Sequence, residues 1–171
     1  MILARRLRSA ADAHKADRGS KLVVILSIWV GISAGFIASE VFPRFTIGNG
    51  WKSIFVLGIG MWLFGVAFRM YSIRVLGRFF TYDVAISREQ HVVEAGPYRW
   101  VRHPSYLGGL LALFGFGMTM TNWAAMLLPA FCSAVGYSYR IPIEERALVR
   151  GLGDEYREYM KRTWRLVPYV F

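Results

Sequence analysis

The sequence predicts an all-α integral membrane protein with about four transmembrane helices, a cytoplasmic connector and a C-terminal cytoplasmic helical tail. Hydrophobic residues make up 55% of the 171 residues, and the mean hydropathy is +0.35. These values are high for a soluble domain. Charged residues make up only 19% and are concentrated between long apolar stretches. At this length we expect one domain, divided into a basic leader (1–21), two transmembrane helices (22–71), a connector (72–103), a transmembrane hairpin (104–140) and a tail (141–171).

Two apolar stretches in the first half of the chain predict the first two spans. Residues 22–39 carry no charge and would form roughly 27 Å of helix, close to the thickness of the bilayer core. Residues 53–68 are also uncharged, and the apolar pattern continues past Arg69 to Tyr71. A cleavable signal peptide is an alternative for the first stretch, but both its leader and its apolar run are long for one. We therefore expect a retained anchor.

The third uncharged stretch, residues 104–138, is too long for one crossing. Thr119, Thr121 and Asn122 interrupt it, and Trp123 is of a type common at membrane interfaces. The stretch therefore predicts a tight helical hairpin, with one helix over 104–120 and the other over 123–139.

Small residues recur in these spans at the spacing of helix contacts. They are Gly31 and Gly35 in the first span and Gly108, Ala112 and Gly115 in the third. Such residues let helices approach closely, within one chain or between chains, so they leave the oligomeric state open. The single cysteine excludes an internal disulfide framework and a multi-cysteine metal site.

The basic residues predict the orientation. There are 21 Lys and Arg against 11 Asp and Glu, a formal net charge of +10. All of the basic residues lie in the leader, in residues 69–102 or from Arg140 onward, except Arg44 and Lys52, which lie in the first external turn. Because basic loops remain in the cytoplasm, we expect a multi-pass protein with both termini cytoplasmic. Topology then explains the charge, with contact to anionic lipid as a secondary effect, and no nucleic-acid partner is expected.

The connector shows a different pattern. Residues 80–86 alternate between apolar and polar types, which is a period of two. A polar turn at 87–90 precedes residues 91–93, which are suited to a return strand. We expect a short β-hairpin or an extended loop on the membrane surface.

The connector ends in GPYRWVRHPSYLG, residues 96–108. Pro104 suits the first turn of a helix, where its missing N–H removes no hydrogen bond. Arg102 and His103 therefore flank a positive helix end, which favours an anion over two cations. Either residue alone is best explained as a topology anchor or a helix cap. Together with Tyr106 one turn on, and with Gly108 allowing close approach, they indicate a binding site.

The tail begins near Pro142 with the acidic pair Glu144 and Glu145. Acidic residues are ordinary in a first helical turn, and position alone favours that interpretation. The antiparallel hairpin, however, brings this pair to the same membrane face as His103. An acidic pair opposite a basic cluster suits a zwitterionic ligand. The glycines at 151 and 153 predict a break before a second short helix that begins at Asp154.

These motifs resemble those of the isoprenylcysteine carboxyl methyltransferase family. The resemblance covers roughly residues 78–168 and rests on four features: GPYRWVRHPSYLG, the two-span hairpin, EERAL at 144–148 and GDEYREYMKRTWRLVP at 153–168. Phospholipid methyltransferases share a looser version of the pattern. The family binds S-adenosylmethionine between the last two spans and the tail, and it does not use a Rossmann-type fold.

The resemblance also implies a site, residue by residue. The cofactor-binding set would be Tyr98, Arg102, His103, Tyr106, Gly108, Glu144 and Glu145. The catalytic set would be Glu145, Arg102 and Arg165, and no metal is implied. The methyl acceptor would be lipid-like or prenylated and would enter from the membrane. A carboxylate acceptor needs alignment and exclusion of water rather than a base. For an amine or a thiol acceptor, Glu144 or Glu145 would be the base.

Two other classes of protein remain open. A sterol-reductase-like membrane enzyme would have a similar C-terminal half, but it would be longer and would bind NADPH. A non-enzymatic adaptor with a basic face would bind anionic lipid, but it gives no reason for a glutamate pair opposite a histidine.

Overall fold

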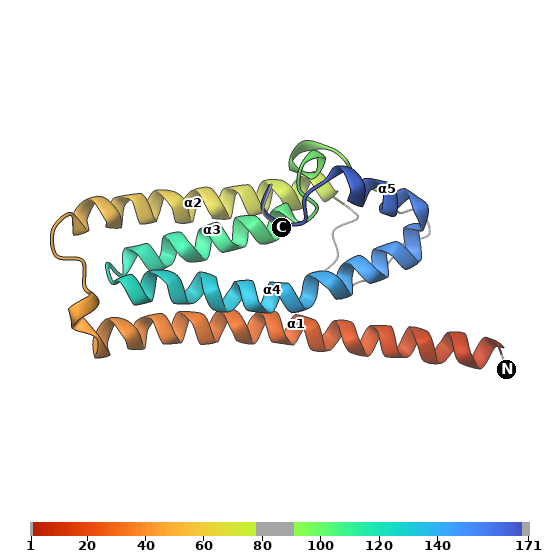
Figure 1. Ribbon diagram of the computed structural model, residues 1–171, viewed down its shortest axis with the longest axis horizontal. Coiled ribbons are helices and arrows are strands. Elements are labelled where there is room, and N and C mark those ends of the chain that lie inside the picture. The colour runs from red at the N-terminus through yellow and green to blue at the C-terminus, as the bar shows by residue number, and fades with distance from the viewer. Residues whose placement is uncertain (1, 78–90, 169–171) are drawn as a thin grey trace.

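The fold is described from a computed structural model, which covers residues 2–77 and 91–168, with side chains from residue 19 onward. The described part is helical, in agreement with the predicted fold class, and Figure 1 shows long helices running side by side. In chain order the elements are α1 (Ile2–Val41), η1 (Pro43–Phe45), α2 (Trp51–Leu76), η3 (Gly96–Arg99), α3 (Pro104–Thr119), α4 (Trp123–Leu152) and α5 (Asp154–Arg162).

The four long helices lie in the order α2, α3, α4, α1 (Figure 1). Helix α2 packs along α3, α3 packs against α4, and α4 packs along α1. The loop from α1 to α2 is held against the α3–α4 turn, where the N–H of Ile47 donates to the carbonyl of Thr121 at 2.8 Å. Helices that are consecutive in sequence, α1 and α2, are therefore not direct neighbours in the row.

Small residues line the contact between α2 and α3. A Cβ built on Gly58 would lie 2.8 Å from the Met118 Cβ and 2.9 Å from the Gly115 carbonyl oxygen. On the other side of the bundle, a Cβ built on Gly31 of α1 would lie 2.9 Å from the Cys132 Cβ of α4. The small-residue spacing thus marks contacts within the chain, since small residues let membrane helices approach closely.

The α3–α4 hairpin turns at Asn122, as the sequence predicts. The Asn122 side chain is almost completely buried. Its Oδ1 accepts from the N–H groups of Ala124 and Ala125 at 3.0 and 3.2 Å, and its Nδ2 donates to the carbonyl of Phe42 at 3.1 Å. Asn122 is therefore the N-cap of α4 and also the link between the hairpin and the end of α1.

Replacing Asn122 with alanine is expected to lower stability by about 1–2 kcal/mol, because α4 loses its cap and the Phe42 carbonyl loses its donor. Asn122→Ser is the matched control, since serine can still cap the helix but is too short to replace the amide donor. The thermal unfolding midpoint in detergent should fall in the order wild type, Asn122→Ser, Asn122→Ala. Equal midpoints for the two variants would contradict the capping role.

Two parts of the sequence prediction differ from the structure or lie outside it. Helix α4 runs unbroken through Pro142 to Leu152, across the boundary placed between the hairpin and the tail. Buried contacts on either side of the proline, by Ile141 and Glu145, hold the helix together although one backbone hydrogen bond is missing. The first strand of the predicted connector hairpin, residues 80–86, lies outside the described residues, and residues 91–93 form no strand.

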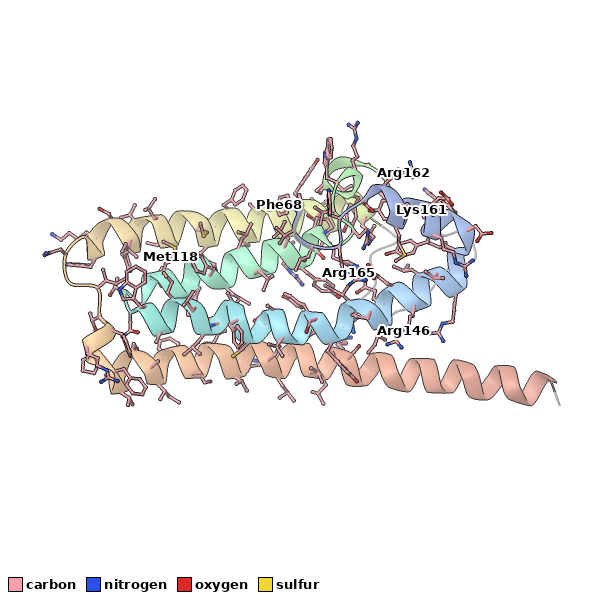
Figure 2. All side chains as sticks on the ribbon, viewed as in Figure 1. Phe68, Met118, Arg146, Lys161, Arg162 and Arg165 are labelled. Carbon is pink, nitrogen blue, oxygen red and sulfur yellow. The ribbon has the colours of Figure 1, made fainter. Side chains whose placement is uncertain are left out.

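Apolar side chains cover much of the outside of the bundle (Figure 2). Trp29 of α1, Val56 of α2 and Phe131 of α4 are 64%, 65% and 65% exposed. Two segments, Gly19–Val41 and Trp51–Leu76, are long and apolar enough to cross a membrane by length and composition. Large exposed apolar surfaces of this kind mark contact with lipid or with other proteins.

Candidate functional site

The C-terminal segment lies alongside the residues that lead into α3. The N–H of Arg102 donates to the carbonyl of Trp164 at 2.8 Å, and the N–H of Trp164 donates to the carbonyl of Trp100 at 2.9 Å. The N–H of His103 donates to the carbonyl of Arg165 at 3.2 Å. This short parallel pairing brings three cationic or titratable side chains, from positions far apart in the sequence, to the N-terminal end of α3.

Glu145 of α4 lies at the centre of these side chains. Its Oε1 accepts from Arg102 Nε at 2.9 Å and lies 3.3 Å from His103 Nε2, and its Oε2 is 3.0 Å from Arg165 Nη2. The side chain of Glu145 is only 5% exposed. Burial alone would raise the pKa of this carboxyl group, but the hydrogen bonds from His103 and Arg102, together with that from Arg165, outweigh burial and lower its pKa to about 2. Glu145 is therefore ionised at neutral pH and joins three chain segments.

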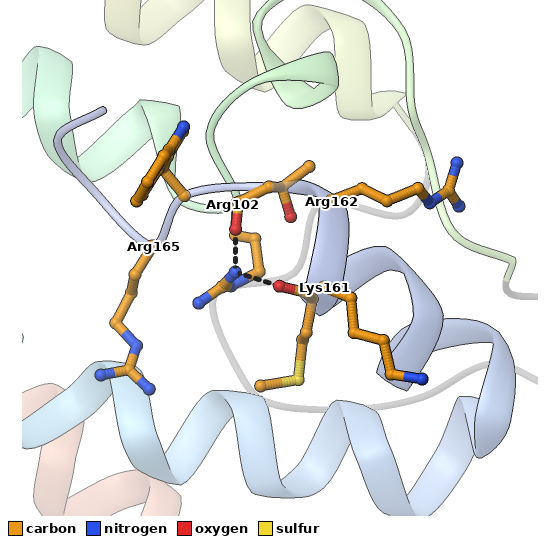
Figure 3. Close-up of a pocket in the computed structure, with 7 residues that line it drawn as sticks. Arg102, Lys161, Arg162 and Arg165 are labelled. Carbon is orange, nitrogen blue, oxygen red and sulfur yellow. Dashed lines mark hydrogen bonds between the residues drawn. The ribbon is translucent and has the colours of Figure 1, made fainter. Parts of the chain in front are cut away.

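Arg102 also caps the end of α5. Its Nη1 donates to the carbonyl of Met160 at 3.0 Å and to the carbonyl of Thr163, as Figure 3 shows. These carbonyls lie at the C-terminal end of the helix, where backbone acceptors lack helical partners and a positive charge is favourable. The guanidinium thus ties the connector, α4 and α5 together.

Glu144, the neighbour of Glu145, belongs to a second network. Its Oε2 accepts from the Tyr106 hydroxyl at 2.7 Å, and the same hydroxyl accepts from Arg140 Nε at 2.9 Å. Arg140 Nη1 in turn donates to Ser20 Oγ of α1 at 2.9 Å. The side chain of Glu144 is 27% exposed, against 5% for Glu145. Glu144 is therefore the member of the acidic pair that retains accessible carboxylate surface.

A cavity of about 400 Å³ adjoins the Glu145 cluster. In Figure 3, Arg165 points from the tail toward α4, whereas the side chain of Arg162 extends away from it. The volume lies within the range of sites that hold small molecules, and the basic lining favours an anionic group. The lining residues are Arg102, Met160, Lys161, Arg162, Thr163, Trp164 and Arg165.

Tyr98 and Gly108 lie apart from the Glu145 cluster. Tyr98 is buried, and its carbonyl accepts from the Tyr159 hydroxyl at 2.7 Å. Gly108 faces α2, because a Cβ there would lie 2.7 Å from the backbone nitrogen of Arg69 and 2.9 Å from the Gly65 carbonyl oxygen. The close approach that the sequence predicts at Gly108 is thus an approach of α2, whereas the other five residues of the predicted cofactor set lie in the two networks above.

Sequence reasoning missed two polar residues of this region. The charge pattern indicates Arg140 only as a basic residue at the start of the tail, and its i, i+4 spacing to Glu144 is the signal for a further role. Ser20, which is completely buried, carried no signal, since its partner lies 120 positions away.

The comparisons with known proteins place this chain in a family. The sequence pattern of the phospholipid methyltransferase family matches residues 53–155. One relative, protein-S-isoprenylcysteine O-methyltransferase B of Arabidopsis thaliana, is 34% identical over 137 residues, which are 79% of this chain and 68% of that protein. The protein-S-isoprenylcysteine O-methyltransferase of Schizosaccharomyces pombe is 30% identical over 131 residues, 75% of this chain and 56% of that protein.

The fold agrees with these matches. It resembles the solved structure of the eukaryotic intramembrane Ras methyltransferase ICMT, with a TM-score of 0.65 and 27% identity, over 87% of this chain and 52% of that chain. The fold and the sequence matches are therefore those of the intramembrane methyltransferases. The chain belongs to the phospholipid methyltransferase family, and the resemblance drawn from the sequence motifs is confirmed. The chain spans between about half and about two thirds of the length of these relatives.

Proposed function

We propose that this chain uses S-adenosylmethionine to methylate a carboxylate on a prenylated or otherwise lipid-like acceptor. The observation that carries the proposal is the site itself, where the tail, the start of α3 and α4 meet around Glu145 beside a basic cavity of about 400 Å³. The relatives named as protein-S-isoprenylcysteine O-methyltransferases support a carboxylate as the acceptor group.

The proposal includes a membrane arrangement with four spans and both termini in the cytoplasm. Helix α3 packs along α2, one of the two segments long enough to cross a membrane, and α4 packs along α1, which contains the other. The exposed apolar side chains of α4, such as Leu127, Phe131 and Val135, recur every four residues and form one stripe that suits lipid. The site would then lie at the cytoplasmic ends of the hairpin.

The residues present fit a zwitterionic sulfonium donor. Such a donor carries a carboxylate, for which the basic lining of the cavity is complementary, and it carries an ammonium and a sulfonium, for which a carboxylate is needed. Glu144 supplies accessible carboxylate surface, whereas Glu145 is enclosed by its three partners. We therefore assign Glu144, with Tyr106 orienting it, to the donor's positive groups, and Arg165 and its neighbours in the cavity to the donor's carboxylate.

The chain's residues would act by placement rather than by proton transfer. S-adenosylmethionine supplies an electrophilic methyl group when bound. An ionised carboxylate acceptor already has a lone pair, so no side chain has to remove a proton, and the helices need only align the acceptor and exclude water. Glu145 would hold Arg102 and Arg165 in position. Were the acceptor an amine or a thiol, Glu144 would be the base, since a carboxyl group with a pKa of about 2 is a poor one.

The first test is calorimetric titration of the detergent-purified protein with S-adenosylhomocysteine. We expect saturable one-to-one binding, and NADPH in a parallel titration should not bind. Glu144→Gln should weaken binding of S-adenosylhomocysteine by roughly tenfold or more, since one charge-assisted contact of this kind contributes about 1.5–3 kcal/mol. Binding of NADPH alone would move the protein to the reductase class, and binding of neither would remove the support for both enzymes.

The matched control for this experiment is Glu158→Gln in α5. Glu158 forms an exposed pair with Lys161, in which the two side chains are 62% and 69% exposed. Exposed pairs contribute little to stability, so this variant should bind S-adenosylhomocysteine like the wild type. An equal loss in both glutamine variants would argue against Glu144 as a donor-binding residue.

A further inference from the structure

An arginine lies within the apolar helix α2. Arg69 belongs to the segment Trp51–Leu76, which is long and apolar enough to cross a membrane. Its Nη1 donates to the carbonyl of Ser105 at 2.9 Å, in the first turn of α3. Within the part of the chain that the structure describes, this is its one hydrogen bond, and no carboxylate lies at ion-pair distance. A guanidinium has five N–H donors, so most of those of Arg69 remain available.

The surroundings of Arg69 are polar although the helix is apolar. A Cβ built on Gly109 of α3 would lie 3.3 Å from Arg69 Nη1 and 2.8 Å from the Tyr137 hydroxyl. The guanidinium and the hydroxyl therefore meet over a stretch of α3 backbone that carries no side chain. These two polar groups occupy the place of the missing side chain, between α2, α3 and α4.

Tyrosines connect the surroundings of Arg69 with the proposed donor site. Tyr98 is within electrostatic range of both Arg69 and Glu144, although burial is the main reason why its pKa is raised. The ring of Tyr106, whose hydroxyl holds Glu144, stacks on the ring of Tyr137 with a centroid distance of 4.6 Å. Arg69 and Glu144 thus lie on two sides of the same group of tyrosines.

The other arginines of the region already have strong partners. Arg102 binds Glu145 and two carbonyls, and Arg165 binds Glu145. Arg140 binds the Tyr106 hydroxyl and Ser20. Arg69 differs because a single backbone carbonyl is its partner among the described residues. A charged residue inside a transmembrane helix is costly and is usually retained for function.

We propose that Arg69 binds the carboxylate of the methyl acceptor from the membrane side of the site. This inference rests on the proposed function and deepens it by naming the residue that recognises the reacting group. The planar guanidinium matches a carboxylate with two parallel hydrogen bonds. A carboxylate has about four lone-pair sites, so two such bonds leave a lone pair for the methyl group.

Methyl transfer changes the charge of the group that Arg69 would bind. An oxygen lone pair forms the new O–CH₃ bond while the C–S bond of the donor breaks and its electron pair stays on sulfur. The acceptor thereby changes from an anion to a neutral ester. Arg69 would hold the substrate more strongly than the product, which favours release of the ester.

The experiment uses the full chain in detergent, with N-acetyl-S-farnesylcysteine as the acceptor and its carboxamide as a competitive inhibitor. In Arg69→Met the KM for the acid should rise at least tenfold, while the Ki of the carboxamide should change less than twofold. In Arg69→Lys the KM for the acid should lie between those of the wild type and Arg69→Met, because lysine keeps the charge but not the planar pair of donors. The Kd for S-adenosylhomocysteine should stay within twofold in both variants, which also shows that they are folded.

Two further variants test whether the change in KM is specific to Arg69. Arg74→Met is the matched control, since Arg74 lies on the same helix and is exposed, and its KM for the acid should stay within twofold. Gly109→Ala keeps Arg69 but places a methyl group 3.3 Å from its Nη1, so it should also raise the KM for the acid.

The outcomes separate this inference from the proposed function. An unchanged KM for the acid in Arg69→Met, or equal losses for the acid and the carboxamide, would overturn the role of Arg69 while methyl transfer by the wild type still stood. Absence of both S-adenosylhomocysteine binding and methyl transfer in the wild type would overturn the proposed function and this inference with it. Donor binding without any binding of the acid would overturn the acceptor class and the role of Arg69 together.

Discussion

Glu145→Gln is expected to destabilise the protein by about 3–5 kcal/mol, because it removes one partner of a buried charge cluster. Arg102 and Arg165 would keep their positive charges, but a neutral amide would stand where both now contact a carboxylate. The tail would then lose its main attachment to α4. The thermal unfolding midpoint in detergent at pH 7 measures this loss.

The same variant should change the response to acid. The pKa of Glu145 is about 2 in the folded protein, against 4.5 for an ordinary glutamate. A lowered pKa gives stability that is fully present above about pH 4.5 and is lost as the pH falls toward 2, and its size is about 3 kcal/mol. The midpoint of the wild type should therefore fall between pH 5 and pH 3, and that fall should be smaller in Glu145→Gln.

Glu158→Gln serves as the control for both measurements, since its pair with Lys161 is exposed. It should match the wild type at pH 7 and retain the acid-induced fall. If Glu145→Gln behaved like Glu158→Gln, the cluster at Glu145 would not be what holds the tail. If Glu145→Gln kept its stability but lost donor binding, Glu145 itself would contact the donor.

The helices of the hairpin could be predicted because their signals are local. The uncharged length, the polar residues before Trp123 and the cap at Asn122 lie within a short stretch of sequence. The structure places α3 within one residue of its expected bounds and starts α4 at the expected residue, whereas α4 continues to Leu152 instead of ending near 139. The proximity of His103 to the acidic pair could be predicted from the antiparallel geometry alone. A short turn between two helices returns the chain to the membrane face from which the first helix started.

The rest of the site depends on contacts between distant segments. The pairing of Trp164 with the residues before α3, and the bond from Arg140 to Ser20, join positions that have no shared local pattern. The motif likewise assigned the close approach at Gly108 to a bound ligand, because spacing does not say which neighbour occupies that face. Only the arrangement of α2 beside α3 shows that the neighbour is another helix.

That contact between α2 and α3 yields the second large effect, at Gly65. A Cβ at this position would lie 2.7 Å from Ala112 Cα and 2.8 Å from the Gly108 carbonyl oxygen. Both are backbone atoms of a packed helix, so neither can move as the end of a side chain can. Gly65→Ala should therefore separate the two helices and cost about 3 kcal/mol, at the upper end of ordinary overpacking.

Gly60 of α2 provides the matched control, because nothing lies within 4 Å of a Cβ built there. Gly60→Ala should retain or slightly raise the unfolding midpoint, since alanine favours helix over glycine by about 1 kcal/mol. Gly65 also lies one helical turn before Arg69, whose guanidinium reaches Ser105 of α3. Separation of the helices should therefore raise the KM for the acidic acceptor as well as lower the midpoint. A lower midpoint with an unchanged KM would mean that Arg69 does not depend on this contact to reach its place in the site.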